Sequence, residues 1–181
     1  YFSHMKSHIT LILGGARSGK STRAEMLARA SERPVTYVAT YAPGASDAEM
    51  TERIRVHRSR RPEDWQTVEN RFDLPTLFRE LQGRTVVLDC LTLWLSYHFG
   101  TVPEADLLEH LREGLSAARK SDLDLYLVSN ELGMGLVPSS PEGRGFRDLQ
   151  GRANQLAAAL ADDVELQVAG LPLSLKGVRR P

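Results

Sequence analysis

The stretch Gly14-Gly15-Ala16-Arg17-Ser18-Gly19-Lys20-Ser21 decides the fold of this 181-residue chain. It satisfies the pattern G-x-x-x-x-G-K-[ST] at every fixed position. The apolar run before it, residues 8–13, is typical of a buried strand, and residues 21–30 after it have a helical pattern. Strand, glycine-rich loop and helix in this order predict a phosphate-binding loop.

The residue types of this loop explain its chemistry. Glycines allow successive backbone N–H groups to turn inward around phosphate oxygens, and the helix N-terminus adds partial positive charge. Lys20 would reach the β- and γ-phosphates of a nucleotide, and the Ser21 hydroxyl would bind Mg²⁺. The alternative, an ordinary glycine-rich turn, is disfavoured because the fixed residues occur in the right setting.

The rest of the chain alternates short β-rich runs with helical stretches, which predicts an α/β domain with a mostly parallel sheet flanked by helices. The last two strands resemble a hairpin, so one C-terminal edge strand should be antiparallel. The fold class predicted is therefore a P-loop NTPase of the RecA-like type. Further strands are expected at residues 35–39, 65–69, 85–88, 123–129, 164–169 and 171–175. Further helices are expected at residues 47 to about 60, 74–81, 91 to about 98 and 144–161. Thr101 and Glu104 form a capping box that should open one more helix, which ends at about residue 120.

Composition limits the class of protein. The 23 basic and 23 acidic residues cancel, and 41% of residues are apolar. These values exclude a disordered chain and argue against a nucleic-acid partner. One cysteine excludes an internal disulfide and a cysteine-based zinc site, and no apolar run is long enough to span a membrane. Residues 1–5 look like a tag remnant, so we expect one soluble cytoplasmic domain over residues 6–181.

Ligands of such sheets bind at the carboxyl ends of the strands. The run Val86-Val87-Leu88-Asp89 is a strand that ends in a carboxylate. Asp89 would bind Mg²⁺, directly or through water, or contact another part of the nucleotide. The alternative is that Asp89 caps the helix that follows, and both roles can hold together.

The predicted helix at residues 47–60 carries His57 at the edge of an apolar stripe formed by Met50 and Ile54. Spacing alone favours a structural histidine, although neighbouring arginines favour the neutral, nucleophilic imidazole. The basic cluster would suit a polyphosphate, or it could be a solvated face paired with Glu49, Glu52 and Glu63. The cluster consists of Arg53, Arg55, Arg58, Arg60 and Arg61.

Several motifs together resemble the bifunctional adenosylcobinamide kinase / adenosylcobinamide-phosphate guanylyltransferase family of cobalamin biosynthesis. The most selective are Asn130-Glu131-Leu132-Gly133-Met134-Gly135-Leu136-Val137-Pro138 and Gly151-Arg152-Ala153-Asn154-Gln155. Others are the phosphate loop, Tyr37-Val38-Ala39-Thr40, Asp47-Ala48-Glu49-Met50 with Arg53-Ile54 and His57, Trp65-Gln66-Thr67-Val68-Glu69, Leu88-Asp89-Cys90-Leu91-Thr92 and Phe146-Arg147-Asp148.

The resemblance implies two reactions. The first transfers the γ-phosphoryl group of ATP or GTP to the aminopropanol hydroxyl of adenosylcobinamide. The second transfers GMP from GTP to adenosylcobinamide phosphate, giving adenosylcobinamide-GDP and pyrophosphate. In the family a histidine carries GMP covalently, and by the motif this residue is His57 here, with Lys20 as the second catalytic residue.

The resemblance also implies binding residues and partners. Ala39, Thr40 and Tyr41 should line the nucleotide site, and Glu69 or Asp89 should read guanine or hold the metal. The basic run Arg58, Ser59, Arg60 and Arg61 should lie near the nucleotide. Adenosylcobinamide and its phosphate are the implied partners, in a homo-oligomer for which a trimer with the corrinoid between subunits fits the family.

Three other functions remain open on the residues alone. A single-function P-loop kinase would use the phosphate loop and leave His57 structural. A regulatory module would bind nucleotide and do little chemistry. A metal-dependent nucleic-acid enzyme is disfavoured by the neutral net charge and by the localised nature of the arginine cluster.

Overall fold

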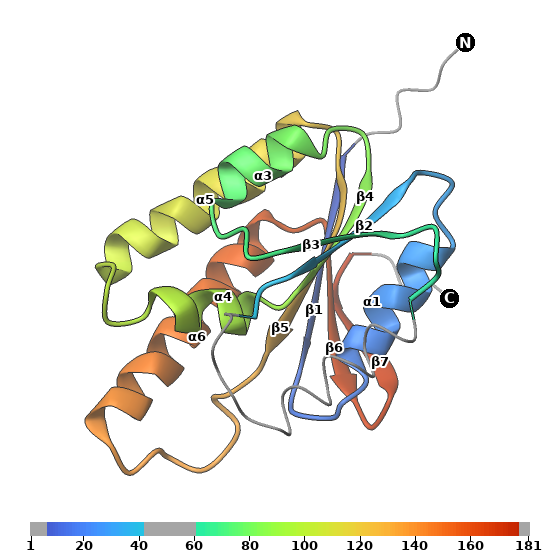
Figure 1. Ribbon diagram of the computed structural model, residues 1–181. Coiled ribbons are helices and arrows are strands. Elements are labelled where there is room, and N and C mark those ends of the chain that lie inside the picture. The colour runs from blue at the N-terminus through green and yellow to red at the C-terminus, as the bar shows by residue number, and fades with distance from the viewer. Residues whose placement is uncertain (1–6, 42–60, 178–181) are drawn as a thin grey trace.

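The computed structural model describes residues 7–41 and 61–177. The tag-like residues 1–5 and the predicted helix at 47–60, with His57, Arg58, Ser59 and Arg60, lie outside this part of the chain. The described residues form a sheet of seven strands in the order β3-β2-β4-β5-β1-β6-β7 (Figure 1). The strands are β1 (His8–Gly14), β2 (Val35–Ala39), β3 (Gln66–Glu69), β4 (Thr85–Asp89), β5 (Asp124–Asn130), β6 (Asp163–Val168) and β7 (Leu171–Lys176).

The sheet confirms the predicted topology. Neighbouring strands from β3 to β6 are all parallel, and only the pairing of β6 with β7 is antiparallel. Because these strands are parallel, the carboxyl ends of β1, β2, β4 and β5 meet at one edge of the sheet. Helices join the consecutive strands that are not neighbours in the sheet.

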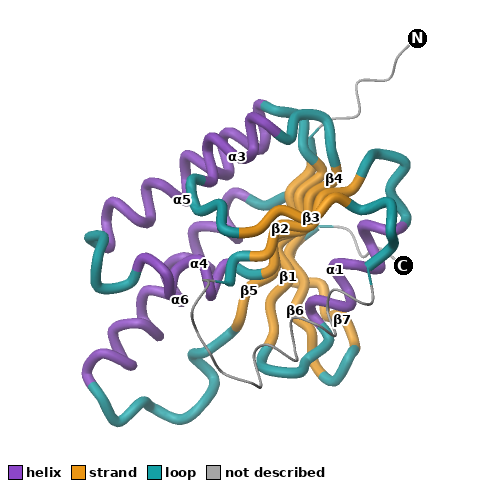
Figure 2. Tube along the Cα trace, in the orientation of Figure 1, coloured by secondary structure: helices purple, strands orange, loops and turns teal. Residues whose placement is uncertain are grey.

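Helices cover both faces of the sheet. Helix α1 packs on one face and the other four described helices pack on the opposite face, as Figures 1 and 2 show. The helices are α1 (Lys20–Arg29), α3 (Leu74–Glu80), α4 (Leu91–His98), α5 (Glu104–Lys120) and α6 (Pro141–Leu160). Among these helices, none is long and apolar enough to cross a membrane.

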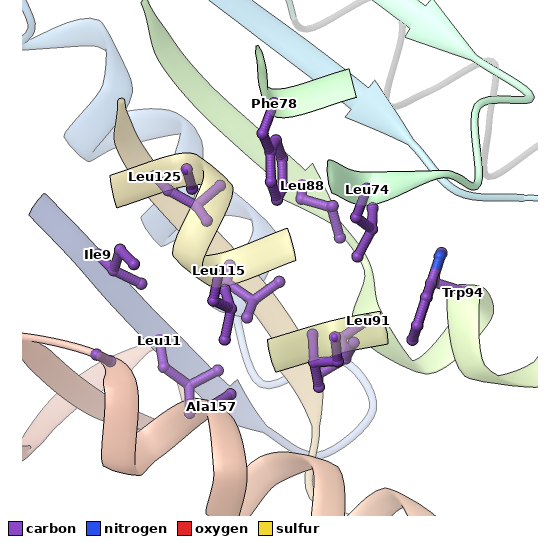
Figure 3. Packing of buried hydrophobic residues seen from close by; sticks show 14 of the residues in the cluster. Ile9, Leu11, Leu74, Phe78, Leu88, Leu91, Trp94, Leu115, Leu125 and Ala157 are labelled. Atoms are coloured by element: carbon purple, nitrogen blue, oxygen red, sulfur yellow. The ribbon is translucent and has the colours of Figure 1, made fainter. Parts of the chain in front are cut away.

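Alternation along each strand divides the core into two layers. In β1, Leu11 belongs to the larger cluster beneath α3, α4, α5 and α6, whereas Ile12 belongs to the smaller cluster beneath α1. Figure 3 shows Leu11, Leu88 and Trp94 in the larger layer. Because side chains of a strand point alternately to its two faces, each central strand is apolar on both sides.

Two details of the predicted helices are wrong. The capping box of Thr101 and Glu104 does not form: the Thr101 hydroxyl donates to the carbonyl of His98, and the carboxylate of Glu104 bonds with Arg152. Helix α6 begins at Pro141 rather than at residue 144, because the Ser140 hydroxyl accepts a hydrogen bond from the backbone N–H of Gly143 and caps this end.

Candidate active site

The candidate site lies at the sheet edge where β1, β4 and β5 end. Strand β1 leads into the phosphate loop, β4 ends in Asp89, and β5 lies between them. The register pairs Gly14 with Asn130, so β1 and β5 end level with each other, and it pairs Asp89 with Val128, so β4 ends two residues earlier at the same edge. This edge therefore brings the phosphate loop and the predicted metal-binding carboxylate close together.

The phosphate loop is tightly packed at its two outer glycines. A Cβ atom on Gly14 would lie 2.3 Å from the Ser18 hydroxyl oxygen, and Gly19 has a positive φ of 95°. The carbonyl of Ser18 accepts a hydrogen bond of 2.9 Å from the N–H of Gly170, in the turn between β6 and β7. The last hairpin of the chain thus supports the outer side of the phosphate loop, and Figure 1 shows the two turns side by side.

Lys20 begins helix α1 and its ammonium group donates to the carbonyl of Gly15 at 2.9 Å. Burial lowers the pKa of Lys20, while the negative charge of Asp89 opposes that shift. A phosphate entering the loop would replace the Gly15 carbonyl as partner of the ammonium and would stabilise its charged form. Lys20 is therefore placed to bind a phosphate on the side of the loop that faces Asp89.

Asp89 is held by a tyrosine from the neighbouring strand. The Tyr37 hydroxyl donates to one carboxylate oxygen of Asp89 at 2.6 Å. Burial, together with the adjacent Asp89 carboxylate, raises the pKa of Tyr37, so the phenol remains a donor. Asp89 does not cap α4, because Cys90 is the N-cap residue of this helix. The capping alternative is therefore wrong, and Oδ1 of Asp89 has no hydrogen bond to another described residue.

Arg61 reaches the same face of the sheet. Its guanidinium carbon lies 3.6 Å from the centre of the Tyr37 ring, and it donates to the Thr67 hydroxyl at 3.3 Å. Cation–π contact of this kind is favourable when the cation is partly desolvated. The structure thus links one of the predicted nucleotide-site arginines to Asp89 through Tyr37.

The predicted residues at the end of β2 differ in what they can offer a ligand. Thr40 is fully buried, and its hydroxyl donates to the Cys90 carbonyl and accepts from the Cys90 N–H, at 2.6 and 2.8 Å. Thr40 therefore joins β2 to the start of α4, while Tyr41 is half-buried. Ala39 pairs with Asp89 on one side and with Glu69 on the other, which places both carboxylates on the same face as Ala39.

The donor set at this edge fits Mg²⁺. Ser21, in the first turn of α1, supplies a hydroxyl, and Asp89 supplies a carboxylate oxygen; both are hard ligands. Among the described residues, no group of three or more His, Cys, Asp or Glu side chains could hold a metal ion. A magnesium ion with two protein ligands would complete its shell with water and phosphate oxygens, as is usual for nucleotide sites.

Sequence reasoning missed several residues that organise the site. Tyr37 lies two residues before Ala39, so strand alternation could have placed the two on one face, but the pairing of β2 with β4 makes this the face of Asp89. A buried network of Ser129, Gln150 and Asn154 behind the end of β5 was also missed. For Gly170 no local signal exists, because its contact with Ser18 spans most of the chain.

Comparison with known proteins extends over nearly the whole chain. Residues 10–175 match the family model described as cobinamide kinase / cobinamide phosphate guanyltransferase. The Pseudomonas aeruginosa bifunctional adenosylcobalamin biosynthesis protein CobP is 44% identical over 170 residues, covering 92% of this chain and 96% of that protein. The Escherichia coli bifunctional adenosylcobalamin biosynthesis protein CobU is 36% identical over 181 residues, covering 92% and 98%.

Solved structures show the fold. The RadB recombinase has a TM-score of 0.54 at 17% identity, covering 96% of this chain and 83% of that chain. A KaiC-like protein from Pyrococcus horikoshii has a TM-score of 0.51 at 14% identity, covering 89% and 71%. These likenesses confirm the predicted RecA-like P-loop fold. The family match over residues 10–175, together with relatives that are similar along almost their full length, shows that the chain belongs to the cobinamide kinase / cobinamide phosphate guanyltransferase family.

Proposed function

We propose that this enzyme phosphorylates adenosylcobinamide with ATP or GTP and then transfers GMP from GTP to the new phosphate through a guanylyl group carried on His57. The observation that carries the proposal is the position of Lys20 beside Asp89 at one sheet edge, in a chain whose family is named for both reactions. His57 enters from the family motif on the segment between β2 and β3. The products are adenosylcobinamide-GDP and pyrophosphate.

The order of the strands supports different roles for the two carboxylates. Strands are spaced about 4.8 Å apart, so Asp89 on β4 is about 10 Å from the strand of the phosphate loop and Glu69 on β3 is about 19 Å away. Asp89 is thus within reach of a metal at the phosphates. Glu69 lies as far from the phosphate loop as the base of a bound nucleotide would lie, and there its carboxylate can accept hydrogen bonds from N1–H and the exocyclic amine of guanine. We assign Mg²⁺ to Ser21 with Asp89, and guanine to Glu69.

The kinase step is an in-line displacement at the γ-phosphorus. The substrate hydroxyl oxygen bonds to phosphorus, the bond to the β–γ bridging oxygen breaks, and the hydroxyl proton is lost as the nucleoside diphosphate leaves. Lys20 and the backbone N–H groups of the loop from Gly15 to Gly19 bind the phosphate oxygens. Mg²⁺, when bound, would neutralise charge on the phosphates.

The guanylyl step is two displacements at the α-phosphorus. An imidazole nitrogen of His57 bonds to phosphorus and pyrophosphate leaves. A phosphate oxygen of adenosylcobinamide phosphate then attacks the same phosphorus and releases the histidine. Splitting the transfer lets the acceptor bind after pyrophosphate has gone.

Labelled nucleotides test both steps. Wild-type protein incubated with Mg²⁺ and α-labelled GTP should retain label that is lost in acid and stable in alkali, and His57→Ala should retain none. The same His57→Ala protein should still transfer label from γ-labelled ATP to adenosylcobinamide. Lys20→Ala should lose both transfers, because both use the triphosphate.

Two results would contradict the proposal. Folded wild-type protein that takes up no label from α-labelled GTP would leave a single-function kinase with a structural His57. Folded wild-type protein that also fails to phosphorylate adenosylcobinamide would leave a nucleotide-binding module. Circular dichroism of each variant is the control for folding.

We also propose a single cytoplasmic domain over residues 6–181 that assembles as a homo-oligomer, with a trimer as the expected form. Exposed apolar side chains on the β6–β7 hairpin support assembly, namely Val168, Leu171, Leu173 and Leu175. Such side chains in one patch are typical of an interaction surface. Light scattering after gel filtration should give the mass of three chains, and a monomer at micromolar concentration would contradict the proposal.

A further inference from the structure

Asn130 is the last residue of β5 and its backbone is fixed from two directions. Its N–H donates to the Thr92 hydroxyl of α4 at 3.0 Å, and its carbonyl accepts from the side-chain amide of Asn154 on α6 at 3.0 Å. It pairs with Gly14, the first residue of the phosphate loop, across the β1–β5 ladder. Its position relative to the loop is therefore defined by the sheet and by two helices.

The side chain of Asn130 belongs to the face of the sheet that carries Asp89. Val128 pairs with Asp89 and lies in the core layer beneath α1, and Asn130 follows two residues later, so it shares that face. The side chain is half-buried. Within residues 7–41 and 61–177, its amide group makes no hydrogen bond. An amide whose donors have no partner among these residues thus lies at the strand between the phosphate loop and the strand of Asp89.

Ser129, the residue before Asn130, helps to fix the position of Asn130 from the opposite face of the sheet. Ser129 is fully buried on the opposite face, where its hydroxyl bonds to Asn154 at 2.7 Å and to Gln150 at 2.9 Å. The same Asn154 holds the Asn130 carbonyl. These hydrogen bonds restrain the backbone at the end of β5. The Cβ position of Asn130 is therefore fixed, and its side chain lies in front of the strand.

From this geometry we infer that Asn130 is a further catalytic residue of the kinase step, whose side-chain NH₂ donates to the γ-phosphoryl group during its transfer. The inference rests on the proposed function. Strand β5 is adjacent to β1, and the N–H of Glu131 donates to the Gly14 carbonyl at 3.0 Å, so the end of β5 stays against the phosphate loop. Lys20 directs the terminal phosphates to this side.

The assignment makes the two reactions respond differently. In the kinase step the γ-phosphorus is the reacting atom, and a fixed donor stabilises charge that redistributes over its oxygens in the transition state. In the guanylyl step the reacting atom is the α-phosphorus, and the γ-phosphate is only part of the leaving pyrophosphate. Loss of the Asn130 donor should therefore harm the kinase step more.

Two substitutions test the inference. Asn130→Ala should lower kcat for phosphorylation of adenosylcobinamide about 100-fold, the usual loss for one preorganised donor, with little change in KM for the nucleotide. Guanylyl transfer to preformed adenosylcobinamide phosphate should fall less than about tenfold. Asn130→Asp keeps the shape, removes the donors and adds negative charge, so its kinase activity should fall at least as far.

Ser129→Ala is the matched control, since it alters the adjacent residue and the shared partner Asn154. It should lower Tm, but because Asn130 keeps its own backbone bonds to Thr92 and Asn154, it should change the ratio of the two activities far less than Asn130→Ala does. Kinase kcat of either Asn130 variant within threefold of wild type, or equal losses in both reactions, would overturn the inference. A wild-type protein that lacks both activities would instead contradict the proposed function, so the two failures are distinguishable.

Discussion

At the scale of single residues, Cys90 is the lone cysteine and lies at the rim of the candidate site. It is buried between the end of β4 and the start of α4, with its backbone tied to Thr40. Burial raises the pKa of the Cys90 thiol to about 12, and the neighbouring Asp89 adds to the shift. Because the thiolate is the reactive form, the folded protein keeps this cysteine inert although it adjoins the phosphate site.

Cys90 should therefore resist alkylation. In native protein at pH 8, iodoacetamide should modify Cys90 far more slowly than in urea-unfolded protein, and mass spectrometry measures both rates. Raising the pH toward the thiol pKa should speed the native reaction as long as the fold persists. Equal native and unfolded rates at pH 8 would contradict the burial of this side chain.

Arg23 and Glu165 form a buried ion pair between α1 and β6. Two guanidinium nitrogens contact the two carboxylate oxygens at 2.9 Å each, and both residues are almost inaccessible to solvent. Removing one partner of such a pair leaves a buried charge and typically costs about 3–5 kcal/mol. Sequence alone could not find this pair, because its members are 142 residues apart.

Glu165→Ala should therefore lower the free energy of unfolding by about 3–5 kcal/mol, measured by urea denaturation. The matched control is Glu104→Ala, which breaks the exposed Arg152–Glu104 pair between α5 and α6 and should have a much smaller effect. Similar losses in the two variants would show that burial does not decide the strength of these pairs.

At the scale of elements, α3 and α5 approach each other closely at Gly114. A Cβ atom on Gly114 would lie 2.8 Å from Cβ of Leu74, which is too short for two carbon atoms and cannot be relieved by a side-chain rotation. Glycine inside a helix is unfavourable by about 1 kcal/mol relative to alanine. The contact between the two helices therefore outweighs helix propensity at this position.

Gly114→Ala should destabilise the protein by about 1–3 kcal/mol, the usual cost of overpacking. Gly151→Ala on α6 is the comparison, because nothing lies within 4 Å of the position that its new methyl group would take, and the change should stabilise by about 0.5–1 kcal/mol. Thermal and urea unfolding give both values. A stabilised Gly114→Ala protein would contradict the close approach of α3 and α5.

The helices and strands also differ in how well the sequence predicted them. Alternating apolar runs predicted β2 at residues 35–39, and the parallel sheet followed from the helices between strands. The first turn of α6 was missed because Gly143 is typical of a loop, whereas Ser140 and Pro141 provide the start of the helix. Motifs predicted Lys20 and Asp89, but the Tyr37 contact depends on which strands become neighbours.

At the scale of the whole molecule, one sheet separates two apolar layers. Trp65 lies in the layer beneath α1, and Trp94 lies in the layer on the opposite face. The central strands contribute alternate side chains to both layers. Loss of packing in one layer would therefore disturb the strands that also hold the apolar side chains of the other layer. This arrangement supports the proposal of a single cooperative domain.

The two tryptophans provide a direct measurement. Trp94→Phe leaves Trp65 as the only tryptophan, and Trp65→Phe leaves Trp94. In each variant the fluorescence midpoint in urea should coincide with the midpoint from far-ultraviolet circular dichroism, as two-state unfolding requires. Separate midpoints for fluorescence and circular dichroism within one variant would show that the layers unfold independently.

The hydrogen bond from Gly170 to Ser18 also bears on when the enzyme matures during translation. The loop that binds the phosphates is synthesised first, and Gly170, one of its supports, follows 152 residues after Ser18. In a nascent chain that still lacks the β6–β7 hairpin, the phosphate loop has no hydrogen bond from Gly170 on its outer side. Tight nucleotide binding should thus arise only after the β6–β7 hairpin has been synthesised.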